Sequence, residues 1–268
     1  MKIIKRIVIG FVVILVGIIG LVMIVSSVRW QRDYEDFDVV VNDVLIPTGE
    51  TAVTQGEHIA TTRYCGFCHG DNLAGGYLLN EPVIAVVPAP NLTSGAGGVG
   101  ASNSDEDWVR AIRHGVGHDK RGLIGMPSRI WYEMSDEDLG ALIAYLKTLP
   151  AIDNELPERR IGPFIRVMLV LGQAPVSEAM IIDHDAPRSP MPERAVTVEF
   201  GQYLAAGCTA CHGPDMAGGT IRDLNGELIV ALNLTPGGEL RGWSEADFIS
   251  TMRTGVTVNG RSLNETMP

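Results

Sequence analysis

The N-terminal segment contains one long hydrophobic run. From Ile7 to Val25, 19 consecutive residues carry no charged or strongly polar side chain. As a helix with a rise of about 1.5 Å per residue, this run is long enough to cross roughly 30 Å of hydrocarbon. Lys2, Lys5 and Arg6 precede the run, whereas the arginines that follow it are accompanied by acidic residues, so we predict a cytoplasmic N-terminus.

The alternative for this segment is a cleaved secretory signal. Such signals have a shorter apolar core of about 7 to 15 residues and a small-residue cleavage site. The VSSV sequence after the run is a poor cleavage site. We therefore predict an uncleaved single-pass anchor over residues 1–28, with everything after Val28 outside the cytoplasm.

Later in the chain, hydrophobic residues recur at helical spacing. The clearest case is SDEDLGALIAYLKTLP, in which five apolar residues share one helix face before Pro150: Leu139, Leu142, Ile143, Leu146 and Leu149. Ser104, Ser135 and Ser244 each precede an aspartate by three residues, which is typical of capped helix N-termini. The β-prone run Val39–Ile46 lies in a predicted juxtamembrane spacer, residues 29–52. Long β-forming runs are absent, so we predict an all-α fold with extended loops.

Two stretches of the chain repeat each other. CGFCHGDNLAGG begins at Cys65 and returns as CTACHGPDMAGG at Cys208, 143 residues later. NLT, SDEDW or SEADF, AIRHGV or TMRTGV, and MP then follow in the same order. The first cysteine and the methionine of MP are 61 residues apart in one copy and 59 in the other. We predict two tandem domains, residues 53–150 and 197–268.

The segment between the repeats, residues 151–196, is predicted to be a linker. It is rich in proline and charge, and it contains one apolar piece, residues 161–173. Because this piece is short and interrupted by Arg166, it cannot span a bilayer. We expect it to pack between the two domains; the alternative is contact with the membrane surface.

The charge balance limits the kinds of partner. The chain has 21 basic and 32 acidic residues, a net charge of −11. This argues against nucleic acid, which is bound through clustered Lys and Arg. The acidity suits a basic protein partner, and it equally serves solubility alone.

All four cysteines lie in the two CxxCH motifs, at positions 65, 68, 208 and 211. Two thiols three positions apart, followed directly by an imidazole, suit covalent attachment of haem, with His69 or His212 as the proximal iron ligand. A zinc site would need a second ligand pair nearby, and a thioredoxin-type dithiol would need a βαβ setting. Neither is visible, so we predict two covalently bound c-type haems and no structural disulfide.

The sixth iron ligand decides the redox potential of each haem. Met126 and Met267 occupy matching places and are each followed by proline, which makes them the candidates. Three other methionines are weaker alternatives: Met134, Met216 and Met252. Surface or loop roles are expected for the remaining histidines, His58, His114, His118 and His184, although His114 or His118 could compete for the first iron.

Other repeated positions suggest supporting roles. Glycines after each motif would let the backbone pass close to the porphyrin, and the loops PAPNLT and ALNLT would offer a carbonyl to the proximal histidine. Pro90 has Leu232 as its counterpart, so this contact is expected to differ between the copies. Arg113 and Arg253 either pair with a haem propionate or lie on a solvated helix face.

On these motifs, the repeats resemble class I cytochrome c domains in a membrane-anchored dihaem arrangement, over roughly residues 53–150 and 197–268. The resemblance implies three main helices around each haem, His/Met ligation and one-electron transfer. It implies that Cys65, Cys68, His69 and Met126 serve one haem, and Cys208, Cys211, His212 and Met267 the other. The last helix of the first repeat has no counterpart before Pro268, so we expect domain 2 to be C-terminally incomplete.

The sequence therefore predicts an electron carrier without catalytic residues, tethered to the cell membrane with its haem domains on the periplasmic side. Its expected partners are the membrane and a redox donor and acceptor, such as a dehydrogenase, a quinol-oxidising complex or a terminal oxidase. One alternative is the cytochrome c subunit of a periplasmic dehydrogenase. A dihaem peroxidase is the enzyme alternative, but it needs an exchangeable iron position, against which two methionine ligands argue. No signalling module that a sensor would need is visible.

Overall fold

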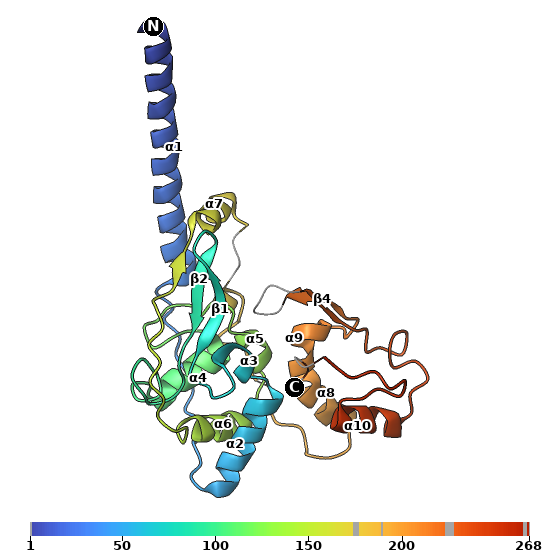
Figure 1. Ribbon diagram of the computed structural model, residues 1–268. Helices are drawn as coiled ribbons and strands as arrows, with labels where there is room; N and C mark the ends of the chain where they lie inside the picture. The colour runs from blue at the N-terminus through green and yellow to red at the C-terminus, as the bar shows by residue number, and fades with distance from the viewer. Residues whose placement is uncertain (1, 174–176, 189, 223–227, 265–266, 268) are drawn as a thin grey trace.

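The computed structural model of the chain describes residues 2–173, 177–188, 190–222, 228–264 and 267. Its helices and strands, in chain order, are α1 (Lys2–Tyr34), α2 (Glu50–Thr62), α3 (Gly66–His69), β1 (Gly76–Glu81), β2 (Ala85–Ala89), α4 (Asp105–His114), α5 (Ser128–Trp131), α6 (Asp136–Leu146), β3 (Arg160–Ile161), α7 (Pro163–Leu171), η1 (Glu178–Met180), α8 (Val198–Ala205), η2 (Ala206–Cys208), α9 (Thr209–His212), β4 (Gly219–Arg222), β5 (Leu228–Ala231) and α10 (Glu245–Thr254). Figure 1 shows α1 projecting from a body in which the second repeat lies beside the first.

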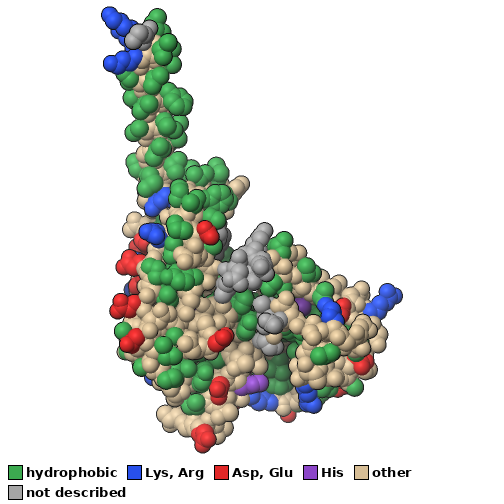
Figure 2. Space-filling model, in the orientation of Figure 1, with side chains coloured by type: hydrophobic (Ala, Val, Ile, Leu, Met, Phe, Trp, Pro, Cys, Tyr) green, Lys and Arg blue, Asp and Glu red, His purple; other side chains and the backbone are tan. Residues whose placement is uncertain are grey.

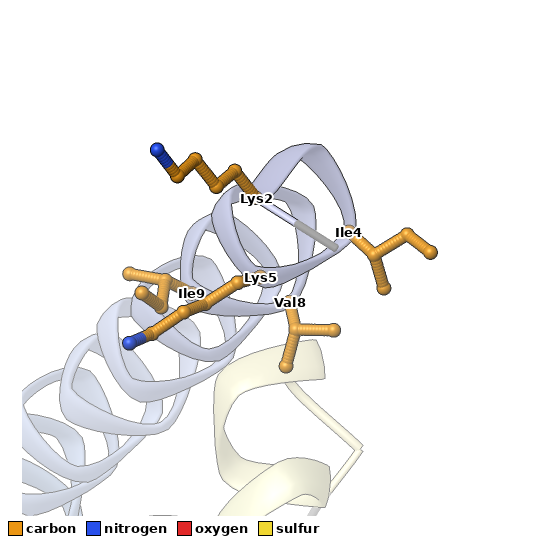
Figure 3. A pocket seen from close by; sticks show the side chains of 5 residues that line it. All are labelled: Lys2, Ile4, Lys5, Val8 and Ile9. Carbon is orange, nitrogen blue, oxygen red and sulfur yellow. The ribbon is translucent and has the colours of Figure 1, made fainter.

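Helix α1 is 33 residues long and contains the hydrophobic run of the N-terminal segment. It is apolar enough to cross a membrane, and none of its most apolar window is buried inside the protein. The helix continues to Tyr34, so the first part of the expected spacer is helical. At the N-terminal end, Lys2 and Lys5 project from the isolated helix among apolar side chains that pack against no other element (Figure 3). By length and composition, α1 is a candidate membrane span.

The expected strand at Val39–Ile46 is wrong. The structure has irregular backbone there, and Val41, Val44 and Ile46 pack instead against the hydrophobic core of the first repeat. This segment passes so close to α6 that a Cβ on Gly140 would lie 2.3 Å from the Leu45 carbonyl oxygen. Its apolar side chains therefore serve packing on a helix, not pairing in a sheet.

The core of the first repeat is built where α2 packs on α6. Ile59 of α2 and Leu142 and Ile143 of α6 are buried in one cluster with Trp108 of α4. A Cβ on Gly56 would lie 2.0 Å from the Ala141 carbonyl oxygen, so the two helices approach closely at this glycine. The predicted apolar stripe is confirmed, with Leu149 partly buried at its end.

The three predicted helix starts are confirmed. Ser104, Ser135 and Ser244 are the N-caps of α4, α6 and α10, and each side chain accepts a hydrogen bond from the backbone N–H three residues later. In α4 and α10 the aspartate also bonds back to the cap backbone, which completes a capping box.

The all-α expectation is wrong in part, because short strands are present beside the helices. Strands β1, β2 and β3 form one antiparallel sheet, and β4 and β5 form a hairpin at the corresponding place in the second repeat. Pro88 lies within β2, where proline usually argues against a strand. The partner β3 comes from the predicted linker, so no local pattern announced this sheet.

The predicted linker is largely packed on the first repeat. The Ile152 carbonyl accepts hydrogen bonds from Asn91 Nδ2 at 2.7 Å and Thr93 Oγ1 at 3.1 Å. Helix α7 packs on α1, not between the repeats, which corrects the expectation for the apolar piece. Figure 1 shows α7 beside the base of α1, away from the second repeat.

The second repeat is more exposed than the first. No residue of α8 is buried, whereas α2 buries Gly56, Ile59 and Ala60. On α10, Phe248 is 42% and Met252 48% exposed. Within the described residues, the second repeat has no counterpart of α6, the helix that covers these faces in the first repeat.

Candidate functional site

The first CxxCH motif lies on a single helical turn. Cys65 is the N-cap residue of α3, and Cys68 and His69 follow within the helix. Burial raises the pKa of both thiols, that of Cys65 to about 12. A reactive dithiol needs the opposite shift, because the thiolate is the nucleophile. The setting therefore does not favour thioredoxin-type chemistry.

His69 is oriented by the backbone. Its ring is 9% exposed, and Nδ1 lies 2.8 Å from the Pro90 carbonyl oxygen. Burial lowers the pKa of the imidazole, although the bond to Pro90 opposes this shift. In the neutral ring, Nδ1–H donates to the carbonyl, which leaves the lone pair of Nε2 available to a metal. The carbonyl expected from the PAPNLT loop is thus present.

The loop after the motif folds back on the helix. Gly75 N–H donates to the His69 carbonyl at 2.7 Å, and Leu92 N–H donates to the Leu73 carbonyl at 2.9 Å. Gly75 has φ +94°, and a Cβ there would lie 2.8 Å from the Asn91 nitrogen. This glycine is therefore required by the protein backbone itself, a different reason from the porphyrin clearance suggested by the sequence.

The second CxxCH motif has the same local geometry. His212, on α9, is 9% exposed, and its Nδ1 lies 2.8 Å from the Leu232 carbonyl oxygen. Gly218 N–H donates to the His212 carbonyl at 2.8 Å. Met216 has φ 57° where Leu73 has 56°. The change from Pro90 to Leu232 leaves the contact intact, contrary to the expected difference, because only the backbone oxygen takes part.

The second pair of thiols is less enclosed than the first. Cys208 is half-buried and Cys211 is exposed, and burial still raises the pKa of both. Among the residues that the structure describes, no three His, Cys, Asp or Glu side chains are close enough to bind a metal ion together.

The two candidate methionines are in different surroundings. Met126 is partly buried against the core cluster of the first repeat, as is Cys65. Met267 is half-buried, with its N–H donating to the Asn264 carbonyl at 2.9 Å, and Pro268 lies outside the described residues. Met134 is buried in the core, while Met252 is on the surface. The axial roles of Met126 and Met267 stay predictions.

The remaining histidines divide into two groups. His58 and His118 are exposed, as expected. His114 is 5% exposed, which contradicts the surface role, and its Nδ1 lies 2.9 Å from Nδ1 of His184. His184 Nε2 lies 2.9 Å from the Ala179 carbonyl oxygen. The pair joins α4 to the segment after η1, so at least one function of His114 is structural.

Helix α4 carries two buried donors that sequence reasoning did not identify. Trp108 Nε1 and Arg113 Nε have no hydrogen-bond partner among the described residues. Another nitrogen of Arg113, Nη2, donates to the Met134 carbonyl at 2.6 Å and lies 2.9 Å from Asp136. Arg113 is therefore not on a solvated face, whereas Arg253 is exposed. The signal in the sequence was a Trp in one repeat where the other has Phe248.

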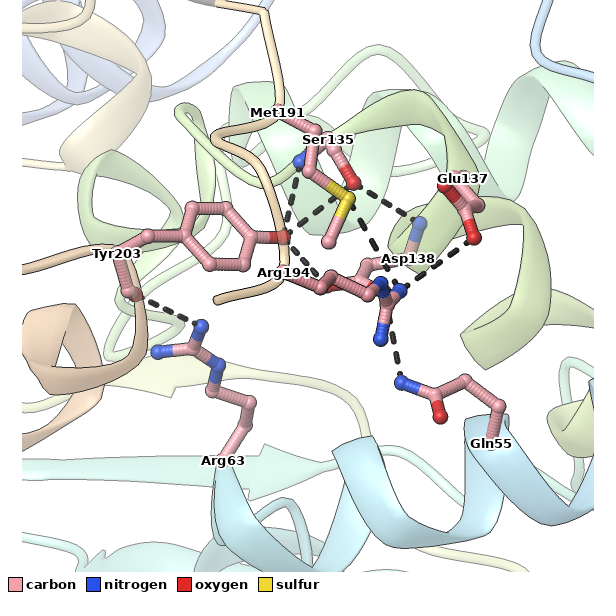
Figure 4. A network of polar contacts seen from close by, with 8 residues as sticks. All are labelled: Gln55, Arg63, Ser135, Glu137, Asp138, Met191, Arg194 and Tyr203. Atoms are coloured by element: carbon pink, nitrogen blue, oxygen red, sulfur yellow. Dashed lines mark hydrogen bonds and ion pairs between the residues drawn. The ribbon is translucent and has the colours of Figure 1, made fainter. Parts of the chain in front are cut away.

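The two repeats meet through a polar network. Arg63 donates to the carbonyls of Tyr203 and Leu204, and its guanidinium lies 5.4 Å from the Trp131 ring centroid and 5.7 Å from that of Tyr203. Figure 4 shows the Tyr203 hydroxyl between Ser135 and Asp138, with Arg194 also reaching Asp138.

This interface brings the two CxxCH segments together. Gly207 directly precedes Cys208, and a Cβ on Gly207 would lie 3.1 Å from Arg63 Nη1 and 3.5 Å from Trp131. The pKa of Tyr64 is raised by burial, then by Asp71 and by the thiol of Cys211. Residues next to one motif thus lie within electrostatic reach of the other.

Comparison with known proteins identifies part of the chain. Residues 51–146 match the family described as "Cytochrome C oxidase, cbb3-type, subunit III". Over 203 residues, 70% of the chain, it is 28% identical to 16% of a nicotinate dehydrogenase subunit from Pseudomonas putida. Over 104 residues, 36% of the chain, it is 33% identical to 23% of "Gluconate 2-dehydrogenase cytochrome c subunit" of Pantoea cypripedii. The chain spans less than a quarter of the length of these relatives.

Proposed function

We propose, on the premise that residues 51–146 form a cytochrome c domain, that this protein is a membrane-tethered dihaem c-type cytochrome. Cys65, Cys68 and His69 hold one haem with Met126 as the sixth ligand. The second set is Cys208, Cys211, His212 and Met267, in a second domain over residues 197–268. The observation that carries the proposal is the same histidine–carbonyl geometry at both motifs, 2.8 Å in each.

The residues present fit such a group. Each buried histidine has its Nδ1 occupied by a carbonyl and its Nε2 free, and two thiols lie within one helical turn of it. Trp108 Nε1 and Arg113 Nε are buried donors that lack an acceptor, which a haem propionate would supply. The haem supplies one-electron chemistry at iron, and the protein holds it, tunes its potential and offers docking surfaces.

The relatives favour a more specific assignment, in which the chain serves a dehydrogenase. One relative is a cytochrome c subunit of gluconate 2-dehydrogenase, and the other is a subunit of nicotinate dehydrogenase. A substrate would then be oxidised on another chain, and this protein would pass the electrons to a quinol-linked complex or terminal oxidase. The net charge of −11 would steer basic partners to it at a rate that falls with salt.

The cellular location is part of the proposal. Helix α1 would anchor the chain in the cytoplasmic membrane, with the haem domains on the periplasmic side. The length of the helix, its exposed apolar surface and the lysines at its N-terminal end support this orientation.

The test is a count of covalent haems on the full chain, expressed with a working haem-maturation system. We expect the intact mass to exceed that of the polypeptide by two haems. The variant Cys208→Ser with Cys211→Ser should keep one haem, and the pigment should stay with the protein in acidified acetone. A single haem in the unmodified chain, or extraction of the pigment into the solvent, would refute the dihaem assignment.

A further inference from the structure

We propose that three adjoining segments form a collar seated in the outer leaflet of the lipid bilayer. The collar consists of the C-terminal end of α1 (residues 26–29), the turn between β1 and β2 (residues 82–84) and helix α7 (Pro163–Leu171). It would fix the height and tilt of the first repeat above the membrane. The inference rests on the proposed anchoring through α1.

The position of α7 along α1 is set by specific contacts. Leu169 is 2% exposed, and its carbonyl accepts a hydrogen bond from Arg29 Nη1 at 2.7 Å. Arg166 Nη1 donates to Ser26 Oγ at 3.3 Å. Ser26 directly follows Val25, the last residue of the uncharged run. Helix α7 is therefore attached where the candidate span leaves the hydrocarbon.

The outer surface of the collar is apolar. Phe164, Val167 and Leu171 of α7 are 52%, 46% and 62% exposed, and Val83 of the adjacent turn is 67% exposed. The turn and the helix are joined, because Phe164 N–H donates to the Val83 carbonyl at 3.2 Å. In Figure 2 the hydrophobic side chains of α1 continue onto the adjoining end of the body.

A bilayer is the occupant that this continuity favours. An isolated apolar patch could meet a protein or a second copy, but the collar begins where an apolar helix 33 residues long emerges. Any membrane that surrounds α1 reaches the collar as well. Short helices with exposed Phe, Val and Leu lie in the boundary between headgroups and acyl chains in this way.

Charged and aromatic side chains below the apolar surface match the headgroup level. Arg159, Arg160 and Arg166 line a groove with Trp30 and Glu35. Within the described residues, neither Arg160 nor Arg166 forms an ion pair with a carboxylate. Guanidinium groups are suited to lipid phosphates, and Trp is enriched at the same depth.

The test uses the haem-loaded full chain in vesicles of phosphatidylethanolamine and phosphatidylglycerol. A nitroxide label is attached at Val167→Cys, because the native cysteines are held in thioether bonds in the proposed protein. Power-saturation EPR then compares collisions with oxygen, which concentrates in lipid, and with a water-soluble nickel complex. Ile19→Cys on α1 is the lipid reference, and Val198→Cys on α8, 72% exposed in the unmodified chain, is the aqueous reference.

We expect the ratio of oxygen to nickel accessibility to be severalfold higher at residue 167 than at residue 198, and close to that at residue 19. A lipid signal at residue 19 with an aqueous signal at residue 167 would overturn the collar while leaving the anchor intact. An aqueous signal at residue 19 would overturn the anchor, and the collar with it. Protection of residue 167 from both reagents would indicate a protein partner and would also refute the proposal.

Discussion

The His114–His184 pair makes stability depend on pH in a direction that the structure fixes. His184 Nε2–H donates to the Ala179 carbonyl, so its Nδ1 accepts a hydrogen bond from Nδ1–H of His114. Both rings are then neutral, and an added proton would bring two N–H groups face to face. Burial, followed by His184, Arg113, Arg188 and Arg110, lowers the pKa of His114 to about 4.

The size of the effect follows from linkage. The unfolded chain has a histidine pKa of about 6.5, so between that pH and pH 4 the unfolded state binds a proton that the folded state does not. The stabilisation is complete above pH 6.5 and is lost as the pH falls toward 4. Between pH 7 and pH 5 this one group is expected to remove about 2 kcal/mol of folding free energy.

The assay is denaturant unfolding at pH 7 and pH 5 of the unmodified chain and of two variants. His114→Asn keeps a donor near the position of Nδ1 but cannot titrate, so its loss of stability between the two pH values should be smaller by about 2 kcal/mol. His118→Gln is the control, because His118 is exposed and should leave the pH dependence unchanged. If His114→Asn loses as much stability as the unmodified chain, the shifted pKa and the reasoning from burial are wrong.

Three further predictions follow from named contacts. Met126→His should lower the midpoint potential of one haem in a spectroscopic redox titration, by part of the roughly 0.8 V that axial ligands span, whereas Met134→Leu should leave both potentials nearly unchanged. Arg63→Ala and Tyr203→Phe should be coupled by about 1 kcal/mol in a double-mutant unfolding cycle, since both join the repeats; additivity would argue against the interface. Asn91→Ala should cost about 3 kcal/mol in thermal or denaturant unfolding, because Asn91 is fully buried and bonds both Ile152 and Thr93; Asn233→Ala, with one described bond to Thr235, should cost about 1 kcal/mol, and equal losses would contradict this account.

The features predicted correctly from the sequence depend on residues close together in the chain. Ser104 and Asp107 are three positions apart, and their capping box is present. The apolar stripe of α6 is set by helical periodicity. The histidine–carbonyl contact spans 21 residues, but the repeated NLT loop marked its place in both copies.

The features that were missed depend on distant residues. Strand β2 pairs with β3, which lies in the predicted linker, and Arg63 reaches Tyr203 across 140 positions. Neither contact has a periodic signal, because each partner alone fits an exposed loop or helix end. His114 likewise has an unremarkable sequence position, and its burial follows only from the docking of the segment that carries His184.

Contacts outside the repeated motifs predict that the two haems of the proposed dihaem protein differ in potential. Both proximal histidines have the same carbonyl bond, but Arg113 is 1% exposed beside the first site, while Arg253 is exposed beside the second. A buried cation and an enclosed pocket favour the reduced iron, whereas water favours the more highly charged oxidised form. The first haem should therefore have the higher potential, and about 1 kcal/mol of difference in stabilisation corresponds to about 40 mV. A redox titration of the full chain beside the variant Cys208→Ser with Cys211→Ser would assign the two waves. If the haem retained in that variant titrates with the lower wave, burial at Arg113 does not control the order, and electrons would pass between the repeats in the opposite direction.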